Sequence, residues 1–374
     1  MAVMALSLAV HLIYYQLIID NLSTSEHGRR RHMDNLTHAL IGAALGQAGL
    51  KRKTGLGMAA LMIGANVPDI DVLGLPFGEN LSWRRGWTHG PLALLVLPGV
   101  LALALIAFDR WQARRGTRPA ARPSVRLGWL LTLSYLGALT HPLLDLLNTY
   151  GVRCLMPFSE RWFYGDTLFI VDPLIWTVLG LGVGLARRRE SSGQGSGKRI
   201  ALATLSLVVA YVVAMHSGGR LAEDYVARHW DGMGRPQSIR VLASPVPIDP
   251  FSRTILLETT EGYRFGDFGW LPRPHLMWKS KTIPTNMGLP AVARAAGQSK
   301  SVADFLYWSR FPFAMVRQAS GGTEVIIGDA RYNERPDVGP FSVRTLIPSA
   351  RPGAEDEPNS MSIRRGHIDP PRAK

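Results

Sequence analysis

Long apolar runs separated by short basic segments fill the first two thirds of this chain. In the last third, shorter apolar stretches are interrupted by proline and glycine. A helix of roughly 20 apolar residues crosses a hydrocarbon core about 30 Å thick. Four runs reach or approach that length, and we expect a membrane-spanning helix in each: Leu92–Phe108, Leu127–Leu147, Leu168–Ala186 and Ile200–Met215. The pattern predicts a mainly α-helical, polytopic membrane protein.

Two shorter apolar runs, Leu36–Leu50 and Leu56–Val67, precede these four and are rich in glycine and alanine. Small residues allow helix backbones to approach closely inside a membrane. Both runs are therefore predicted to be short, closely packed membrane helices or, alternatively, re-entrant or interfacial segments.

Basic residues collect in three connecting segments, Lys51–Lys53, Arg110–Arg126 and Arg187–Arg199. If each apolar run crosses once, all three lie on one side, and the excess of Lys and Arg assigns that side to the cytoplasm. The protein is therefore expected to be a multi-pass protein of the inner membrane. The polar segments Asn66–His89 and His141–Asp172, together with everything after about Gly218, are expected on the outer, periplasmic side.

Leu6–Leu22 is apolar enough for a signal anchor, but Arg29–Arg31 follow it, and Met33 begins a stretch typical of a protein start. Residues 1–32 are therefore expected to be a misplaced start or a dispensable extension, with a genuine extra span as the alternative. Residues 33–218 are predicted to form the membrane domain. The polar tail 352–374 is expected to be disordered.

Residues 219–351 are predicted to form a β-rich domain outside the membrane. Segments rich in β-branched and aromatic residues alternate there with proline and glycine, as is typical of strands. The expected strands are Ile239–Ala243, Arg253–Thr260, Tyr263–Phe268, Thr323–Gly328 and Phe341–Leu346.

The net charge of +14 raises the possibility of nucleic-acid binding. Lys and Arg are, however, placed in short loops between apolar runs and form no continuous soluble face, so no nucleic-acid partner is expected. The single cysteine, Cys154, excludes an internal disulfide and a thiolate-rich metal site. Any metal ion must therefore be held by nitrogen and oxygen.

Three histidines follow a threonine at the edge of an apolar run: His38, His89 and His141. Each threonine is expected to be a helix N-cap or a hydrogen-bonding partner of its histidine. Pro142 disfavours helical geometry at the residue before it, so we expect a kink or a new helix start there.

Carboxylates lie near these histidines in the sequence. Asp69 and Asp71 follow Pro68, which is expected to place them on a rigid turn, although a simple capping turn is the alternative. His141, Asp145 and Asn148 share one face if a helix continues through them. Asp172 before Pro173 fits either a helix N-cap or a functional carboxylate.

Histidines and carboxylates together bind divalent ions such as Zn²⁺ and Mn²⁺. Such an ion lowers the pKa of a bound water, which then attacks an ester or phosphoester. Ionisable groups within apolar spans, such as Asp145, are costly and usually mark function. Arg84 and Arg85 suit a phosphate or a transition state, and equally a lipid headgroup or surface contact.

Four motifs occur in a fixed order, Met33–Ala39, Asn66–Asp71, Arg85–Gly90 and His141–Gly151. Together they resemble the YdjM-like family of bacterial inner-membrane proteins regarded as metal-dependent hydrolases. The resemblance covers about residues 33–180, and Trp308–Phe313 and Gly328–Tyr332 suggest an extension. It implies a membrane hydrolase whose metal ligands are His38, Asp69, Asp71, His89, His141 and Asp145.

Within that set, His38, Asp69, His89 and His141 are the strongest candidates for direct ligands. Asp71 and Asp145 complete a second ion or act as base and supporting groups, with Arg85 as a further catalytic candidate. The expected cofactor is zinc, or manganese, and the expected substrate is a small molecule or lipid-linked. The alternative is a non-catalytic membrane protein with a structural or transport-related metal. The sequence leaves the oligomeric state open.

Overall fold

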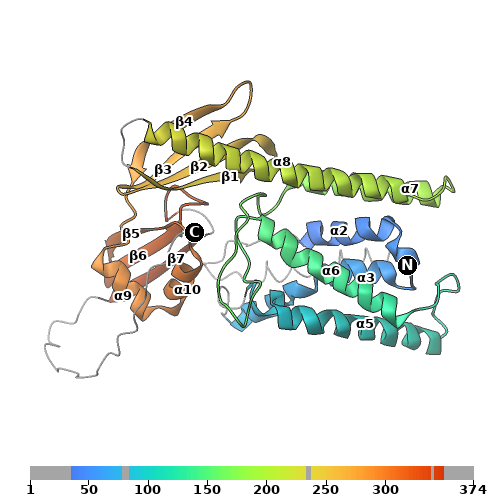
Figure 1. The fold of residues 1–374 in the computed structure, drawn as a ribbon. Helices are drawn as coiled ribbons and strands as arrows, with labels where there is room; N and C mark the ends of the chain where they lie inside the picture. The colour runs from blue at the N-terminus through green and yellow to red at the C-terminus, as the bar shows by residue number, and fades with distance from the viewer. Residues whose placement is uncertain (1–34, 78–83, 233–236, 338–340, 349–374) are drawn as a thin grey trace.

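Among the described residues, six α-helices form the N-terminal part of the protein and lie side by side in Figure 1. The computed structural model describes residues 35–77, 84–232, 237–337 and 341–348. The predictions for residues 1–32 and 352–374 fall outside these described residues. The helices are α2 (Asn35–Gln47), α3 (Gly57–Gly64), α5 (Pro91–Arg114), α6 (Leu127–Leu147), α7 (Pro173–Ser191) and α8 (Lys198–Asp231).

Three of these helices, α5, α6 and α8, are long and apolar enough to cross a membrane. The run Leu168–Ala186, predicted as a fourth span, becomes a helix only at Pro173. Asp172 caps this helix, because its Oδ1 accepts the backbone N–H groups of Leu174 and Ile175 at 3.0 and 3.1 Å. From Pro173 to Ala186 the apolar part of α7 is only about 21 Å long, shorter than the hydrocarbon core.

The two short apolar runs form α2 and α3, and glycines bring them into close contact with their neighbours. A Cβ on Gly42 of α2 would lie 2.7 Å from the carbonyl oxygen of Leu61 in α3. A Cβ on Gly137 of α6 would lie 2.6 Å from the same oxygen. Leu61 is fully buried between these helices. The small residues therefore set how closely the three helices approach, as expected from their composition.

Replacing Gly137 with alanine is expected to destabilise the protein by about 1–3 kcal/mol, because α3 and α6 must move apart. Gly128→Ala is the matched control on the same helix, since its Cβ would meet nothing within 4 Å. That control should be neutral or slightly stabilising. Thermal unfolding in detergent measures both, and equal stabilities for the two variants would contradict the close packing.

The three basic connections meet at one end of the helices. Lys51 and Arg52 pair with Glu190, which follows the arginines at the end of α7. Thr54 Oγ1 accepts the backbone N–H of Arg126 at 2.8 Å, and Gly55 N–H donates to the carbonyl of Ser124 at 3.1 Å. This meeting is what the charge pattern predicted for segments on the same side of a membrane.

Helix α8 continues beyond its apolar run as far as Asp231, through the domain boundary expected at residue 218. Its second half packs against a four-stranded antiparallel sheet in the order β1-β2-β3-β4. The strands are β1 (Ser238–Val246), β2 (Asp249–Thr259), β3 (Gly262–Gly269) and β4 (His275–Ile283). The core between helix and sheet contains Ala222 and Val226 of α8 and Ile255 and Phe268 of the sheet.

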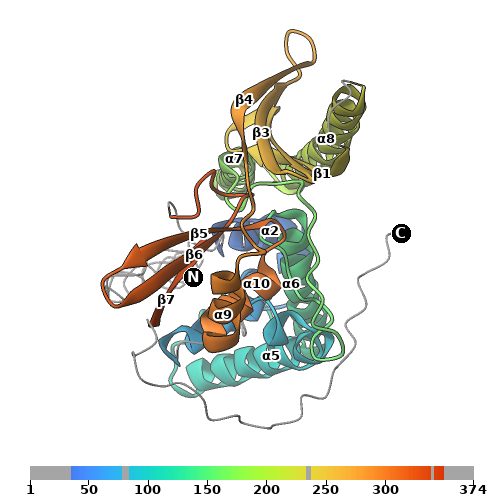
Figure 2. The same cartoon turned by 90° about the vertical axis from the view of Figure 1, so that its left-hand side faces the viewer.

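A second antiparallel sheet, ordered β5-β6-β7, lies apart from the first in Figure 2. It contains β5 (Pro312–Ala319), β6 (Gly322–Asp329) and β7 (Ser342–Pro348), and the short helices α9 (Pro290–Gln298) and α10 (Lys300–Trp308) precede it. The five predicted strands correspond to β1, β2, β3, β6 and β7. The strands β4 and β5 and both helices were not predicted.

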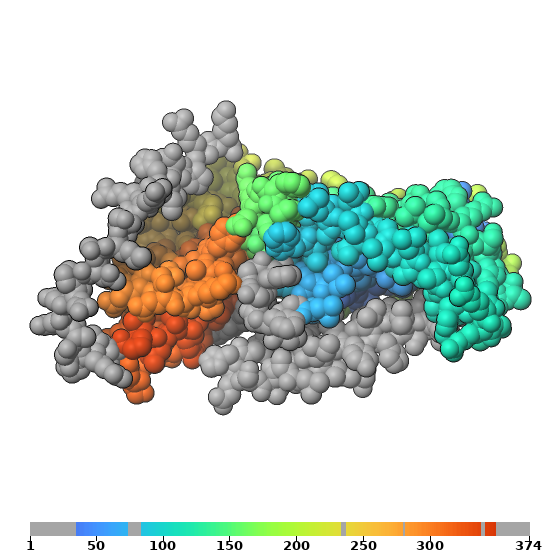
Figure 3. All heavy atoms as spheres, turned by 90° about the horizontal axis from the view of Figure 1, so that it is seen from below, coloured from blue at the N-terminus to red at the C-terminus, as the bar shows by residue number. Residues whose placement is uncertain are grey.

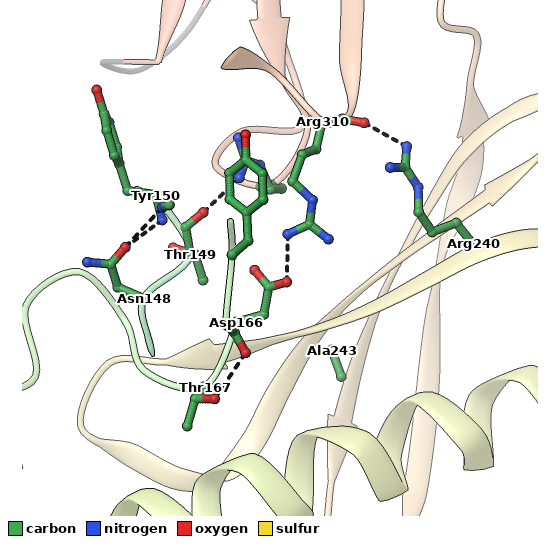
Figure 4. Close-up of polar contacts among 12 residues, drawn as sticks. Asn148, Thr149, Tyr150, Asp166, Thr167, Arg240, Ala243 and Arg310 are labelled. Carbon is green, nitrogen blue, oxygen red and sulfur yellow. Dashed lines mark hydrogen bonds and ion pairs between the residues drawn. The ribbon is translucent and has the colours of Figure 1, made fainter. Parts of the chain in front are cut away.

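The segment between α6 and α7 joins the helical part to the second sheet. In Figure 3 this green segment lies between the blue helices and the orange C-terminal part. Tyr150 and Trp162 belong to the same hydrophobic core as Trp308 of α10. Figure 4 shows the ion pair at 2.6 Å between Arg310 and Asp166. The chain just after α6 is thus held by the C-terminal part of the protein.

Candidate metal centre

Six predicted ligands from four separate segments converge on one buried cluster. They are His38 of α2, Asp69 and Asp71 of the 3-10 helix Val67–Phe77, His89 of the 3-10 helix Trp87–His89, and His141 and Asp145 of α6. Each has at most 5% of its surface exposed. Three overlapping groups within this cluster offer ligand atoms all within 4.8 Å of one another.

Helix α6 passes through Pro142 without interruption, so the predicted new helix start there is wrong. Continuous helix places His141 and Asp145 on one face, four residues apart. Asn148 lies just beyond the helix end with extended backbone, where its side-chain oxygen accepts the N–H groups of Tyr150 and Gly151 at 2.9 and 3.1 Å.

None of the three threonines is a helix N-cap in this structure. Thr37 lies inside α2, where its hydroxyl accepts a hydrogen bond from Trp176 Nε1 at 2.8 Å. Thr140 lies inside α6 and donates to the carbonyl of Gly137 at 2.6 Å. Thr88 instead contacts His89 Nδ1 at 3.0 Å, which confirms the alternative expectation of a hydrogen-bonding partner at that position.

Asp69 and Asp71 lie on regular structure, because a 3-10 helix continues through Pro68 to Phe77. With three residues per turn, side chains two positions apart point in different directions. Asp69 faces His141 at 3.4 Å, and Asp71 faces Arg84 at 3.6 Å. The two carboxylates therefore have different surroundings despite their proximity in the sequence.

Four ligand atoms lie close together in this cluster, each within 3.8 Å of two or three of the others. The two Nε2 atoms of His89 and His141 are 3.1 Å apart. Asp145 Oδ2 lies 3.3 and 3.5 Å from them, and Asp69 Oδ1 lies 3.8 and 3.4 Å from them. For metal–ligand bonds of about 2.0–2.1 Å, tetrahedral ligands are separated by about 3.3–3.4 Å. The atoms of His89, His141 and Asp145 form one group that fits an ion, and Asp69 Oδ1 lies within 3.8 Å of both histidines.

The chemistry of the donor atoms also fits a metal. His141 Nδ1 lies 2.7 Å from the carbonyl of Ala65, and because a carbonyl only accepts, Nδ1 carries a proton and Nε2 is the nitrogen available to a metal ion. Asp69 Oδ1 and Asp145 Oδ2 are buried and have no hydrogen-bond partner among the described residues. Buried polar atoms without partners are costly, and an ion between them removes that cost.

His38 and Asp71 lie at the edge of this four-atom set. The His38 ring stacks on His141 with centroids 3.8 Å apart, and its Nε2 is 3.6 Å from Asp145 Oδ1. Asp71 Oδ2 accepts the backbone N–H of Arg85 at 2.8 Å and lies 3.8 Å from His89 Nδ1. Burial raises the pKa of the Asp71 carboxyl above its ordinary value, although nearby Arg84 opposes the shift.

Arg85 is buried behind Asp145. Its Nη2 lies 3.0 Å from Asp145 Oδ1, and its Nη1 donates to Asn148 Oδ1 and the Gly151 carbonyl at 3.1 and 3.3 Å. The guanidinium also lies over the ring of Tyr150. Its backbone φ of 51° is in the left-handed region, which strains a residue with a long side chain. These contacts join the end of α6 to the segment preceding His89.

A small cavity of about 20 Å³ reaches the cluster from the side of α7. His38, Asp145 and Asn148 line it together with apolar side chains that include Leu168 and Ile175. The same pocket contains Asp172. Asp172 is otherwise occupied in capping α7 and accepting a hydrogen bond from Tyr211 at 3.0 Å.

The fold and the cluster define a helical membrane protein with buried histidines and aspartates able to hold a metal ion. Within that class, the chain belongs to the family of YdjM inner membrane proteins, which it matches over residues 33–221. The matched region runs from α2 into α8 and contains all six candidate ligands. Trp308–Phe313 and Gly328–Tyr332, which the sequence suggested as an extension of the resemblance, lie beyond it.

One similar curated protein is the "Uncharacterized protein YfhP" of Bacillus subtilis (strain 168). It is 30% identical over 159 residues, which are 38% of this chain and 43% of that protein. The chain thus spans less than half the length of this relative. No solved structure matches the chain.

Proposed function

We propose that this protein is a membrane-bound, metal-dependent hydrolase acting on an ester or phosphoester. The observation that carries the proposal is the buried group of His89 Nε2, His141 Nε2 and Asp145 Oδ2, spaced 3.1–3.5 Å apart, with Asp69 Oδ1 within 3.8 Å of both histidines. A bound ion would lower the pKa of a water molecule and supply hydroxide near neutral pH.

In this proposal, Asp69, His89, His141 and Asp145 hold the ion. Thr88 and Asp71 orient His89, in the way that hydroxyl and carboxylate partners usually fix metal-binding imidazoles. His38 lines the pocket, and its Nδ1 has no hydrogen-bond partner among the described residues. It is placed to be a further ligand or to accept a proton from a group entering the pocket.

Arg85 is proposed to position Asp145. Its Nη atoms are engaged by Asp145, Asn148 and Gly151, and only 4% of the residue is exposed. These contacts favour a supporting role over direct contact with a substrate phosphate. The transition-state role expected from the sequence remains a prediction for activity measurements.

A structural metal site is the second candidate, because the same spacing is near that of a closed tetrahedral zinc site. Four protein ligands saturate a four-coordinate ion and leave no position for water. An ion that takes five or six ligands keeps open positions. The identity of the bound ion and its access to solvent water therefore separate the two functions.

The side of the membrane and the substrate class are part of the proposal. The basic connections meet at the end of α6 opposite His141 and Asp145, and an excess of basic residues marks the cytoplasmic side. The centre is therefore proposed to lie near the periplasmic surface. A lipid-linked phosphate or a small-molecule ester fits that location.

The test is metal content by mass spectrometry on detergent-purified protein, followed by a screen of phosphoesters and phospholipids. The wild type is expected to hold zinc or manganese, and His89→Ala and Asp69→Ala are expected to lose it. His229→Ala is the matched control, because His229 is exposed near the end of α8, far from the cluster along the chain. A metal-free wild type, or variants that retain the ion, would overturn the metal centre. If the wild type holds an ion but hydrolyses no ester in the screen, the result would favour the structural metal site over the hydrolase.

A further inference from the structure

One end of the four-stranded sheet exposes large apolar side chains that no described residue covers. Ile248 lies in the turn between β1 and β2, Phe251 follows at the start of β2, and Leu271 lies in the turn between β3 and β4. Their exposed fractions are 66, 53 and 58%. The Trp270 N–H donates to the Phe251 carbonyl at 3.0 Å, so the two turns form one continuous edge. We call these residues the turn edge.

The turn edge adjoins α8 at the point where its apolar run ends. Arg253 Nη2 donates to the carbonyl of Met215 at 3.3 Å. A Cβ on Gly218 would lie 3.3 Å from the Arg253 guanidinium and 3.6 Å from Trp270 Nε1. This end of the sheet therefore lies against residues 215–218 of α8. The opposite end of the sheet lies near the end of α8, where the Ser238 hydroxyl of β1 donates to Asp231 Oδ1 at 2.9 Å.

The exposed residues of helix α8 indicate the depth of the turn edge relative to the membrane. Leu207, Val209 and Val213 are more than half exposed on this candidate span, as expected of side chains that face lipid. From Val213 to Gly218 the helix rises about 7.5 Å. The headgroup layer on each side of the hydrocarbon is about 5–8 Å thick. The turn edge therefore lies at the level of the headgroups.

The composition of the turn edge matches that layer. Trp270 is the kind of residue that gathers at membrane interfaces, where one side of the ring is apolar and the other is wet. Arg273, in the turn between β3 and β4, is exposed and suits contact with anionic headgroups. Asp249 is an exposed acid at the same edge, and its carboxylate is occupied locally by the N–H of Phe251 at 3.0 Å.

We propose that the turn edge inserts its apolar side chains into the headgroup layer of the membrane that α8 crosses. The occupant is lipid because the edge continues the lipid-facing surface of α8. Insertion fixes the sheet against the membrane surface and prevents it from rotating about the exposed part of α8. This proposal depends on the membrane location of the protein and not on its hydrolase activity.

Site-specific fluorescence quenching on the full chain tests the proposal. In a Cys154→Ser background, a single cysteine replaces either Leu271 or Ile239 and receives a small polarity-sensitive fluorophore. Ile239 is the matched control, because it is 60% exposed but lies at the opposite end of the same sheet. Both proteins are placed in vesicles of phosphatidylcholine and phosphatidylglycerol. Matching unfolding temperatures for the two labelled proteins establish that both are folded.

The label at position 271 is expected to be quenched several-fold more by headgroup nitroxide lipids than the label at position 239. Aqueous iodide is expected to give the reverse order. Equal iodide quenching at both positions would overturn the proposal. Shielding of position 271 from both quenchers would also overturn it, because it would place a protein partner or a second copy of the chain there.

Discussion

Replacing Arg331 with alanine is expected to lower the free energy of unfolding by about 3–5 kcal/mol, because it leaves a buried carboxylate without its partner. Arg331 and Asp329 have fully buried side chains and form a two-pronged pair, with both nitrogen–oxygen distances 2.9 Å. A third nitrogen, Nη1, donates to the carbonyl of Thr149 at 2.7 Å. Unfolding of the purified protein in detergent, followed by circular dichroism, measures the loss.

The pH dependence of stability gives a second measurement on the same pair. Burial alone would raise the pKa of Asp329, but Arg331 outweighs burial and holds that pKa below its ordinary value. A lowered folded-state pKa contributes stability that is complete above the unfolded-state pKa of about 3.9 and is lost as pH falls through the folded-state value. This acid-dependent loss is expected in the wild type. In Arg331→Ala it is expected to weaken or reverse, because burial is then opposed only by hydrogen bonds from Ser309 and from backbone N–H groups.

Arg335→Ala is the matched control for Arg331→Ala. Arg335 also pairs with an aspartate two residues away, at 2.8 Å from Asp337, but two thirds of its side chain is exposed. Exposed ion pairs contribute little because water screens them. The control is expected to unfold like the wild type. If both variants lost the same stability, burial could not be the reason for the effect of Arg331.

The hydrogen bond from Arg331 to Thr149 is also connected to the metal cluster through neighbouring residues. Thr149, which it holds, lies between Asn148 and Tyr150, and Asn148 accepts a hydrogen bond from Arg85. Arg85 in turn contacts Asp145. Loosening the C-terminal part is therefore expected to weaken metal binding as well, although Arg331 itself contacts none of the candidate ligands.

The sequence predicts the long helices and the shared face of His141 and Asp145 well, because those features are local. The apolar runs of α5, α6 and α8 have the length that a membrane requires, and the four-residue spacing of His141 and Asp145 defines a shared helical face. Glycine-rich α2 and α3 were recognisable from small residues alone. The convergence of His38 and His89 with that face depends on tertiary packing, and it was expected only from the similar context of the histidines and the family resemblance.

Other features depend on interactions that the sequence does not display. Pro142 is buried inside α6, so the local preference of the residue before proline is overridden in the folded protein. The start of α7 was left open by the sequence, in which Asp172 before Pro173 fitted either a helix N-cap or a functional carboxylate, and in the structure Asp172 is the N-cap. Strand β4 was missed because Lys279 and Lys281 interrupt its apolar character. The insertion of Tyr150 into the C-terminal core joins residues more than 150 positions apart, which local patterns do not encode.

Replacing His141 with alanine is expected to abolish metal binding, whereas His38→Ala is expected to retain the ion. The reason is geometric: His141 Nε2 lies 3.1–3.5 Å from ligand atoms of His89, Asp145 and Asp69, whereas His38 Nε2 approaches the other oxygen of Asp145, Oδ1, at 3.6 Å. Thr88→Val removes only the partner of His89 Nδ1, and losing such a partner typically lowers affinity about 10- to 100-fold. Titration of metal-free protein with zinc and with manganese gives the three affinities.

The metal content of the wild type and of His38→Ala decides between one ion and two. A single ion held by Asp69, His89, His141 and Asp145 requires that His38→Ala keep the full metal content of the wild type. If the wild type holds two equivalents and His38→Ala loses one of them, His38 is a direct ligand of a second ion. In that case Asp145 bridges the two ions, because its Oδ1 faces His38 while its Oδ2 faces His89 and His141. A bridged pair gives the proposed hydrolase a second charge with which to stabilise a phosphoester transition state.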